Sequence, residues 1–243
     1  NYWLTFSADS HIHHAELVRQ AETKGLKLHI ETRVLAESAV TEMVIYTADD
    51  PGLFSRIAGA IALAGAPIAD AKIMTLSNGM ALDTFWIQDA QGGAFEDPER
   101  LERLRSRIEE ALSGRINTTQ ELELLRSQTP PKRTRVFKVP PHVLVDNKLS
   151  RTHTVIELNG RNRVGLLHDV TAAITALGLQ IASAHISTYG VRVVDVFYVK
   201  DIFGLKVENK EKHEAIRKSL LAVLSPPLTS VGGETEQNAA AAE

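Results

Sequence analysis

Apolar and polar positions follow the same plan twice along the chain. In each half, a β-branched and apolar run ends in a tight turn, and apolar positions at helical spacing follow it. Two runs with strand periodicity and a second amphipathic segment come next. The first half therefore predicts strand, helix, strand, strand and helix over 42–47, 53–64, 68–75, 81–88 and 97–112. The second half predicts the same order, with helices near 166–177 and 210–224 and strands over 180–188 and 191–200.

The two halves also correspond residue by residue. The segment Met43–Phe54 matches Ile156–Leu167, so that Gly52 of the first turn meets Gly165 of the second. The correspondence continues past the turns and reaches an aspartate in the last strand of each half, Asp83 or Asp195. Two copies of one small unit explain this agreement.

The order strand, helix, strand, strand, helix is typical of a ferredoxin-like α+β unit, βαββαβ, with an antiparallel sheet and both helices on one face. We therefore expect a fourth strand in each unit. In the first unit we assign it to 136–145, where Pro140-Pro141 favours a sheet edge. The second unit has no obvious counterpart after Leu224, and a strand over 26–34 can fill that gap or extend the other sheet. The predicted organisation is a lead-in helix and strand, a first unit, a second unit and a flexible tail, over 1–35, 40–146, 150–225 and 226–243.

Each first turn places polar side chains and a glycine directly before a helix. The free N–H groups of a helix N-terminus suit a carboxylate, and glycine lets a ligand approach the backbone. The candidate ligand-binding residues lie in the first turn, in the second turn and at the start of the strand that follows the second turn's helix: Asp49, Asp50 and Gly52; Asn162, Arg163 and Gly165; and Gln180. The alternative is that Asp49 and Asn162 are ordinary helix caps and that Gln180 is simply solvated.

The two turns differ in charge. Asp49-Asp50 attracts an ammonium group and repels a carboxylate, whereas Asn162-Arg163 can hold both ends of a zwitterion or a side-chain amide. On this chemistry the second turn ranks slightly ahead of the first.

Two βαββα units with D-x-P-G-L-F and N-x-V-G-L-L turns resemble tandem ACT domains, which are small-molecule sensing modules. The resemblance is closer still to the C-terminal regulatory region of the bifunctional uridylyltransferase and uridylyl-removing enzymes, which modify the PII signalling protein. It includes the lead-in Asn1–Phe6 with its His-rich helix and the strand and loop over 137–151, and it covers about 1–224.

The resemblance implies that glutamine binds the units as an effector and switches catalytic domains that this chain lacks. The Gly-Ser turn with paired aspartates and the His-Asp metal site of those domains do not occur here. We therefore expect a regulatory fragment of a longer enzyme, without catalysis or a cofactor of its own, whereas the parent enzyme is expected to use magnesium. Two alternatives stay open: a ligand-free scaffold for docking or homo-oligomerisation, and a stand-alone enzyme.

Composition excludes several other classes. A net charge of −3 gives no general attraction to nucleic acid or to an anionic membrane, and the basic cluster Lys132-Arg133-Arg135 is expected to be a solvated linker. The chain has no cysteine, no signal peptide and no run long enough to cross a bilayer, so a cytoplasmic location is expected.

Two histidine motifs are candidates for a metal site and for an acid–base pair. In His11-x-His13-His14 two side chains lie one helical turn apart, but no third ligand accompanies them, so a metal site is not expected. His168-Asp169 resembles an acid–base pair. Adjacent helical residues face different directions, so no functional contact between these two is expected.

Overall fold

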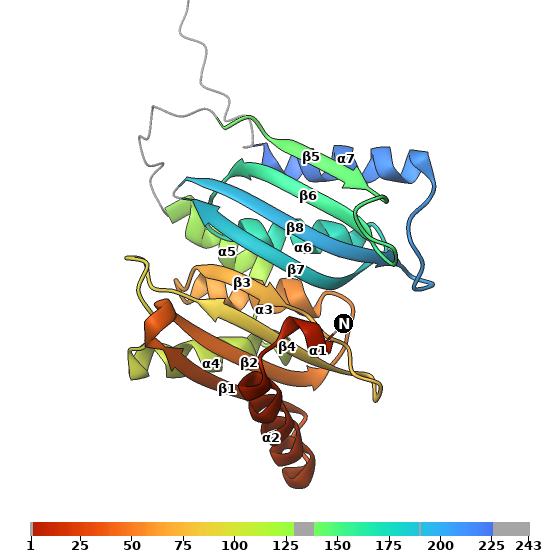
Figure 1. The fold of residues 1–243 in the computed structure, drawn as a ribbon. Coiled ribbons are helices and arrows are strands. Elements are labelled where there is room, and N and C mark those ends of the chain that lie inside the picture. The colour runs from red at the N-terminus through yellow and green to blue at the C-terminus, as the bar shows by residue number, and fades with distance from the viewer. Residues whose placement is uncertain (1, 129–138, 190, 226–243) are drawn as a thin grey trace, which may run out of the picture.

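The computed structural model describes residues 2–128, 139–189 and 191–225, and within them the strands form one eight-stranded antiparallel sheet (Figure 1). The strand order is β1-β2-β4-β3-β7-β8-β6-β5. The strand bounds are Leu28–Leu35 (β1), Val40–Ala48 (β2), Ile68–Lys72 (β3), Met80–Ile87 (β4), His142–Asp146 (β5), Thr154–Arg161 (β6), Leu179–Tyr189 (β7) and Arg192–Asp201 (β8). The helices are Tyr2–Thr5 (α1), Ala8–Lys24 (α2), Leu53–Leu63 (α3), Pro98–Leu112 (α4), Thr118–Gln128 (α5), Leu166–Ala176 (α6) and Lys210–Leu224 (α7), with a 3₁₀ turn at Ala36–Ser38.

The sheet consists of two four-stranded halves that meet at β3 and β7. The first half has the order β1-β2-β4-β3 and the second the order β7-β8-β6-β5, so the two ferredoxin-like units lie side by side. The predicted α+β class, with antiparallel strands and the paired helices of each unit on one face, is confirmed.

Local sequence signals explain where the helices begin. The side chain of Asp97 accepts a hydrogen bond from the backbone N–H of Arg100 at 2.8 Å, and Pro98 occupies the first turn of α4. Asn209 caps α7 in the same way, through the backbone N–H groups of Glu211 and Lys212.

The fourth strands differ from the prediction. The assignment of 136–145 to the first unit is wrong, because β5 pairs with β6 of the second unit and buries Val143 and Val145 in its core. In the first unit the outer position belongs to β1, which pairs with β2 along its whole length. Each unit therefore takes its edge strand from the segment before its βαββα core. Pro140 and Pro141 lie just outside the β5 ladder, where a missing N–H costs nothing.

The two faces of the sheet are covered unequally. Helices α3, α4, α6 and α7 lie on one face of the sheet, where a continuous apolar core runs through both units (Figure 1). On the other face, α2 packs Leu17 and Ala21 against Val44, Tyr46 and Leu82 of the first unit. The predicted tail, 226–243, lies outside the described residues, as does Lys132-Arg133-Arg135.

The seam between the units is narrow in the sheet and tight between the helices. Strands β3 and β7 are paired through Ala71 and Ala184. Helices α3 and α6 lie against each other, and Gly59 permits their approach, since a Cβ atom added there would lie 2.8 Å from His168 Cδ2 and 2.8 Å from Thr118 Cβ. Both the sheet and the helix layer therefore join the two units.

Candidate functional site

A cleft of about 910 Å³ opens at one end of the seam between the units. The first unit contributes the β2–α3 loop and the end of β3, and the second contributes the start of β7 with the ends of α6 and β8. The wall residues fall into these segments: Asp49, Asp50, Pro51, Gly52, Leu53 and Phe54; Lys72, Ile73, Met74 and Thr75; Thr175, Gly178, Leu179, Gln180, Ile181, Ala182 and Ser183; Lys200 and Ile202; together with Thr5, Asp83 and His153. Of the predicted site residues, Asp49, Asp50, Gly52 and Gln180 are thus brought together.

The N-terminus of α3 faces this cleft without a side-chain cap. Its N-cap residue is Gly52, with φ of 80°, so the N-cap position itself has no side chain to offer the first turn of the helix. The side chain of Asp49 instead accepts a hydrogen bond from Thr75 Oγ1, in the connection between β3 and β4. Asp49 is therefore not the N-cap residue of α3, and the partial positive charge of the helix end is directed toward the cleft.

Charged groups of both signs surround the helix end. Asp50 is 66% exposed and lies 3.9 Å from the guanidinium of Arg56. Lys72 and Lys200 enter the wall from β3 and β8, and Gln180 adds an exposed amide from the neighbouring unit. The wall thus presents cations, carboxylates and a polar amide, which are groups complementary to a carboxylate, an ammonium group and an amide, respectively.

Asp83 is the buried acid of the cleft wall. Only 1% of the residue is exposed, and its Oδ1 accepts a hydrogen bond from the backbone N–H of Met74 at 3.4 Å. The pKa of Asp83 is raised from 3.8 to about 8, chiefly by burial and also by the nearby charge of Asp49, while the Met74 hydrogen bond opposes the rise. Asp195, its counterpart in the second unit, shows the same pattern with a pKa of about 7.

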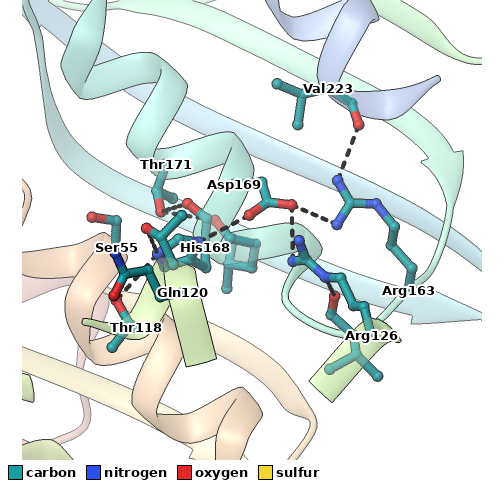
Figure 2. Close-up of polar contacts among 12 residues, drawn as sticks. Ser55, Thr118, Gln120, Arg126, Arg163, His168, Asp169, Thr171 and Val223 are labelled. Carbon is teal, nitrogen blue, oxygen red and sulfur yellow. Dashed lines mark hydrogen bonds and ion pairs between the residues drawn. The ribbon is translucent and has the colours of Figure 1, made fainter. Parts of the chain in front are cut away.

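The second predicted loop is closed. Gly165, the N-cap residue of α6, is buried, whereas Gly52 is half-buried. Figure 2 shows why: α5 lies over this loop, with the guanidinium groups of Arg126 and Arg163 both directed at Asp169. Arg163 is held in place there, and Asn162, Arg163 and Gly165 lie outside the cleft wall. Sequence reasoning did not anticipate α5, whose apolar pattern is short and weak.

His168 and Asp169 do interact, contrary to the prediction. His168 Nδ1 lies 2.9 Å from Asp169 Oδ1, and His168 Nε2 lies 3.2 Å from Thr118 Oγ1 of α5. The first turn of α6 lets these adjacent side chains converge because α5 packs on both of them. Burial alone raises the pKa of Asp169, but hydrogen bonds from His168 and Arg163 and the charges of Arg163 and Arg126 together lower it to about 2.

We expect Asp169→Asn to destabilise the protein by about 2 kcal/mol at pH 7. The depressed pKa means that the ionised carboxylate stabilises the folded state above pH 3.8, and that this contribution is lost as the pH falls toward 2. Urea unfolding between pH 2 and pH 7 measures both effects. The exposed Asp50→Asn is the control, with an expected change below about 0.5 kcal/mol. Equal losses in the two variants would contradict the role given to Asp169.

The N-terminal histidines make structural contacts. His14 is buried, and its Nδ1 lies 3.0 Å from Tyr2 Oη, while His11 Nε2 lies 3.4 Å from the carbonyl oxygen of Tyr2. Within 2–128, 139–189 and 191–225, no group of three or more His, Cys, Asp or Glu side chains is arranged to hold a metal ion. Across the same ranges, no helix has both the length and the apolar character that crossing a bilayer requires.

Comparison with known proteins gives a family match for the second unit and similar enzymes for most of the chain. Residues 149–225 match the N-terminal ACT domain of the ACR family. The chain is 48% identical over 231 residues to the bifunctional uridylyltransferase/uridylyl-removing enzyme of Gluconobacter oxydans, which covers 95% of this chain and 24% of that enzyme. The enzymes of the same name from Azospirillum brasilense and Rhodospirillum rubrum are 52% and 49% identical over 93% and 92% of this chain, and again 24% of their own length is covered.

The chain thus spans about a quarter of the length of these relatives. The expected resemblance to the ACT-containing part of such enzymes is confirmed. Among solved structures, the regulatory subunit of aspartate kinase from Thermus thermophilus covers 76% of this chain and 93% of its own chain at 14% identity, with a TM-score of 0.22. The fold assignment therefore rests on the sheet order and the ACT match.

Proposed function

We propose, from the homology of this chain with part of the bifunctional uridylyltransferase/uridylyl-removing enzymes, that it is an amino-acid-sensing regulatory region with glutamine as the effector. In this proposal the ligand shifts attached catalytic domains between uridylyl transfer to the PII protein and uridylyl removal from it. Those domains carry the magnesium-dependent chemistry, and the whole enzyme acts in the cytoplasm. The chain itself binds and transmits, and it catalyses nothing.

The observation that carries this proposal is the open cleft at the uncapped N-terminus of α3. The α-carboxylate of an amino acid suits the free N–H groups of the helix end, and its ammonium group suits the carboxylates of Asp49 and Asp50. Gln180, which the second unit contributes to the wall, can exchange hydrogen bonds with a side-chain amide. In this proposal the first loop, which the sequence chemistry ranked second, binds the ligand together with Gln180 of the second unit.

The position of the cleft suits a switch. Its walls come from both units, and the sheet joins those units through the Ala71–Ala184 pair. A ligand that contacts both walls therefore stabilises one relative placement of the units over others. Sensing at millimolar concentrations needs only about −4 kcal/mol of binding free energy, and useful switching needs a coupling of about 1 to 3 kcal/mol.

Isothermal titration with L-glutamine tests the proposal. We expect Gln180→Ala to raise the dissociation constant about fivefold, because it removes one hydrogen-bonding group worth about 1 kcal/mol. Asn162→Ala is the matched control, since that amide belongs to the closed loop outside the cleft wall, and its affinity should equal that of the natural protein. Absence of heat at saturating glutamine would exclude glutamine sensing and favour the scaffold alternative.

A further inference from the structure

The duplication places two equivalent positions along the seam, one at each first loop. At the first loop the position is the open cleft. At the second loop it is occupied by α5, the helix that follows α4 in the connection between the units (Figures 1 and 2). The backbone of the two loops does not explain this difference, because both helices begin at a glycine with positive φ and without a side-chain cap.

The contacts of α5 fall on the residues that a ligand at the second loop would need. Arg126 Nε donates to the carbonyl oxygen of Val164 at 3.0 Å, and Arg126 Nη2 lies 2.9 Å from Asp169 Oδ2. A Cβ atom added at Gly165 would collide with Arg126 Nη2 and would lie 2.9 Å from Leu122 Cδ1. At Gly52 the nearest atom to an added Cβ is Ser55 Oγ, at 3.6 Å. The approach to the backbone is therefore blocked at the second loop and free at the first.

The attachment of α5 is modest. Of its eleven residues, Thr118 and Leu122 are buried, and Leu124 is 54% exposed. The Arg126–Asp169 ion pair is partly solvated, with 30% and 19% of the two side chains exposed. Thr118 and Thr119 add hydroxyl contacts to His168 Nε2 at 3.2 and 3.3 Å. A helix of this length is marginal alone, so its stability depends on these contacts with its neighbours. Opening of α5 would break these contacts and no strand pairing of either unit, as in the local opening of short surface elements.

From this geometry we propose that α5 is a displaceable internal cover that restricts the tandem to one ligand. Its departure exposes a second site, at the second loop, for the same class of ligand: a small amino acid bearing a free carboxylate. The inference rests on the proposed sensing function and adds to it an autoinhibitory contact within the chain. The first loop then binds ligand while α5 is in place, and the second loop binds ligand only after α5 has moved away.

Arg126→Glu tests the cover, because it places a carboxylate against Asp169 and leaves the buried Leu122 untouched. Equilibrium dialysis with radiolabelled L-glutamine should give one molecule bound per natural chain and two per Arg126→Glu chain. Arg107→Ala is the control, since it removes an ion pair with Glu110 within α4 that involves no residue of either loop, and it should leave the stoichiometry at one. Circular dichroism verifies that each variant is folded.

Three results would overturn the cover. One molecule per folded Arg126→Glu chain contradicts it while leaving the proposed sensing function intact, and so do two molecules per natural chain. No binding to either protein contradicts both proposals. If Arg126→Glu does not fold, Arg126→Ala removes the same two contacts without adding a charge. The expected numbers of bound glutamine molecules per chain are then the same as for Arg126→Glu.

Discussion

Asp83→Asn is expected to stabilise the protein by about 3 kcal/mol at pH 8.5 and to have little effect at pH 4. Burial holds the folded-state pKa of this acid at about 8, against 3.8 for its ordinary value. Stability that is fully present below pH 3.8 is therefore lost as the pH rises toward 8, because unfolding releases a proton. At about 1.4 kcal/mol per pH unit, the upper limit of the loss is about 6 kcal/mol, and water entering the cleft wall relieves part of it.

Asparagine cannot ionise, yet its Oδ1 can keep the hydrogen bond from the Met74 N–H. Chemical denaturation of both proteins from pH 4 to pH 8.5 measures the divergence. Asp195→Asn, the matched variant in the second unit, should show the same trend over a narrower range, since the pKa of Asp195 is about 7. A constant difference between Asp83→Asn and the natural protein across this range would show that Asp83 is ionised in the fold.

Gly59→Leu is expected to destabilise the protein by about 3 kcal/mol. A side chain at this position has no space, because even a Cβ atom would lie 2.8 Å from both His168 Cδ2 and Thr118 Cβ. Helix propensity favours the replacement of a helical glycine by about 1 kcal/mol, so the loss comes entirely from overpacking. Gly59→Ala combines the same propensity gain with a smaller clash and should cost about 1 kcal/mol or less.

Thermal unfolding of the Gly59 series measures these changes. Ala176→Leu on α6 is the control, because it adds the same leucine at an exposed helical position and should change stability by less than about 0.5 kcal/mol. A Gly59→Leu protein as stable as the control would mean that α3 and α6 separate easily and that the helix layer does not fix the seam.

The order of the strands and helices was accessible from the sequence because it depends on local patterns. Periodicity and the duplicated turns defined βαββα twice, and Asp97 and Pro98 marked the start of α4. The partner of each edge strand was not accessible in this way. Nothing in the alternation of 142–146 specifies whether β5 pairs with β6 or with β2, because both choices bury the same apolar side chains.

The site shows the same division. The sequence identified both loops, since a turn with glycine before a helix is a local feature. It ranked the second loop ahead on the amide of Asn162 and the charge of Arg163, but the Arg163 guanidinium is engaged by Asp169 and by the carbonyl oxygen of Val223. The contrast between the loops comes from α5, whose contacts with α6 join residues 43 to 50 positions apart in the sequence. For Asp83 the sequence showed only that an aspartate recurs at this position of the repeat. The burial that raises its pKa became visible only in the structure.

The edge strands have a practical consequence for dissecting the molecule. Because β1 and β5 each precede the core that they complete, every strand of a half-sheet lies on one uninterrupted stretch of polypeptide. Dividing the gene between codons 128 and 139 therefore yields two polypeptides with four strands each. The first of them contains α5. Mixing the pieces would measure how strongly the halves associate across the β3–β7 seam once they are no longer covalently joined.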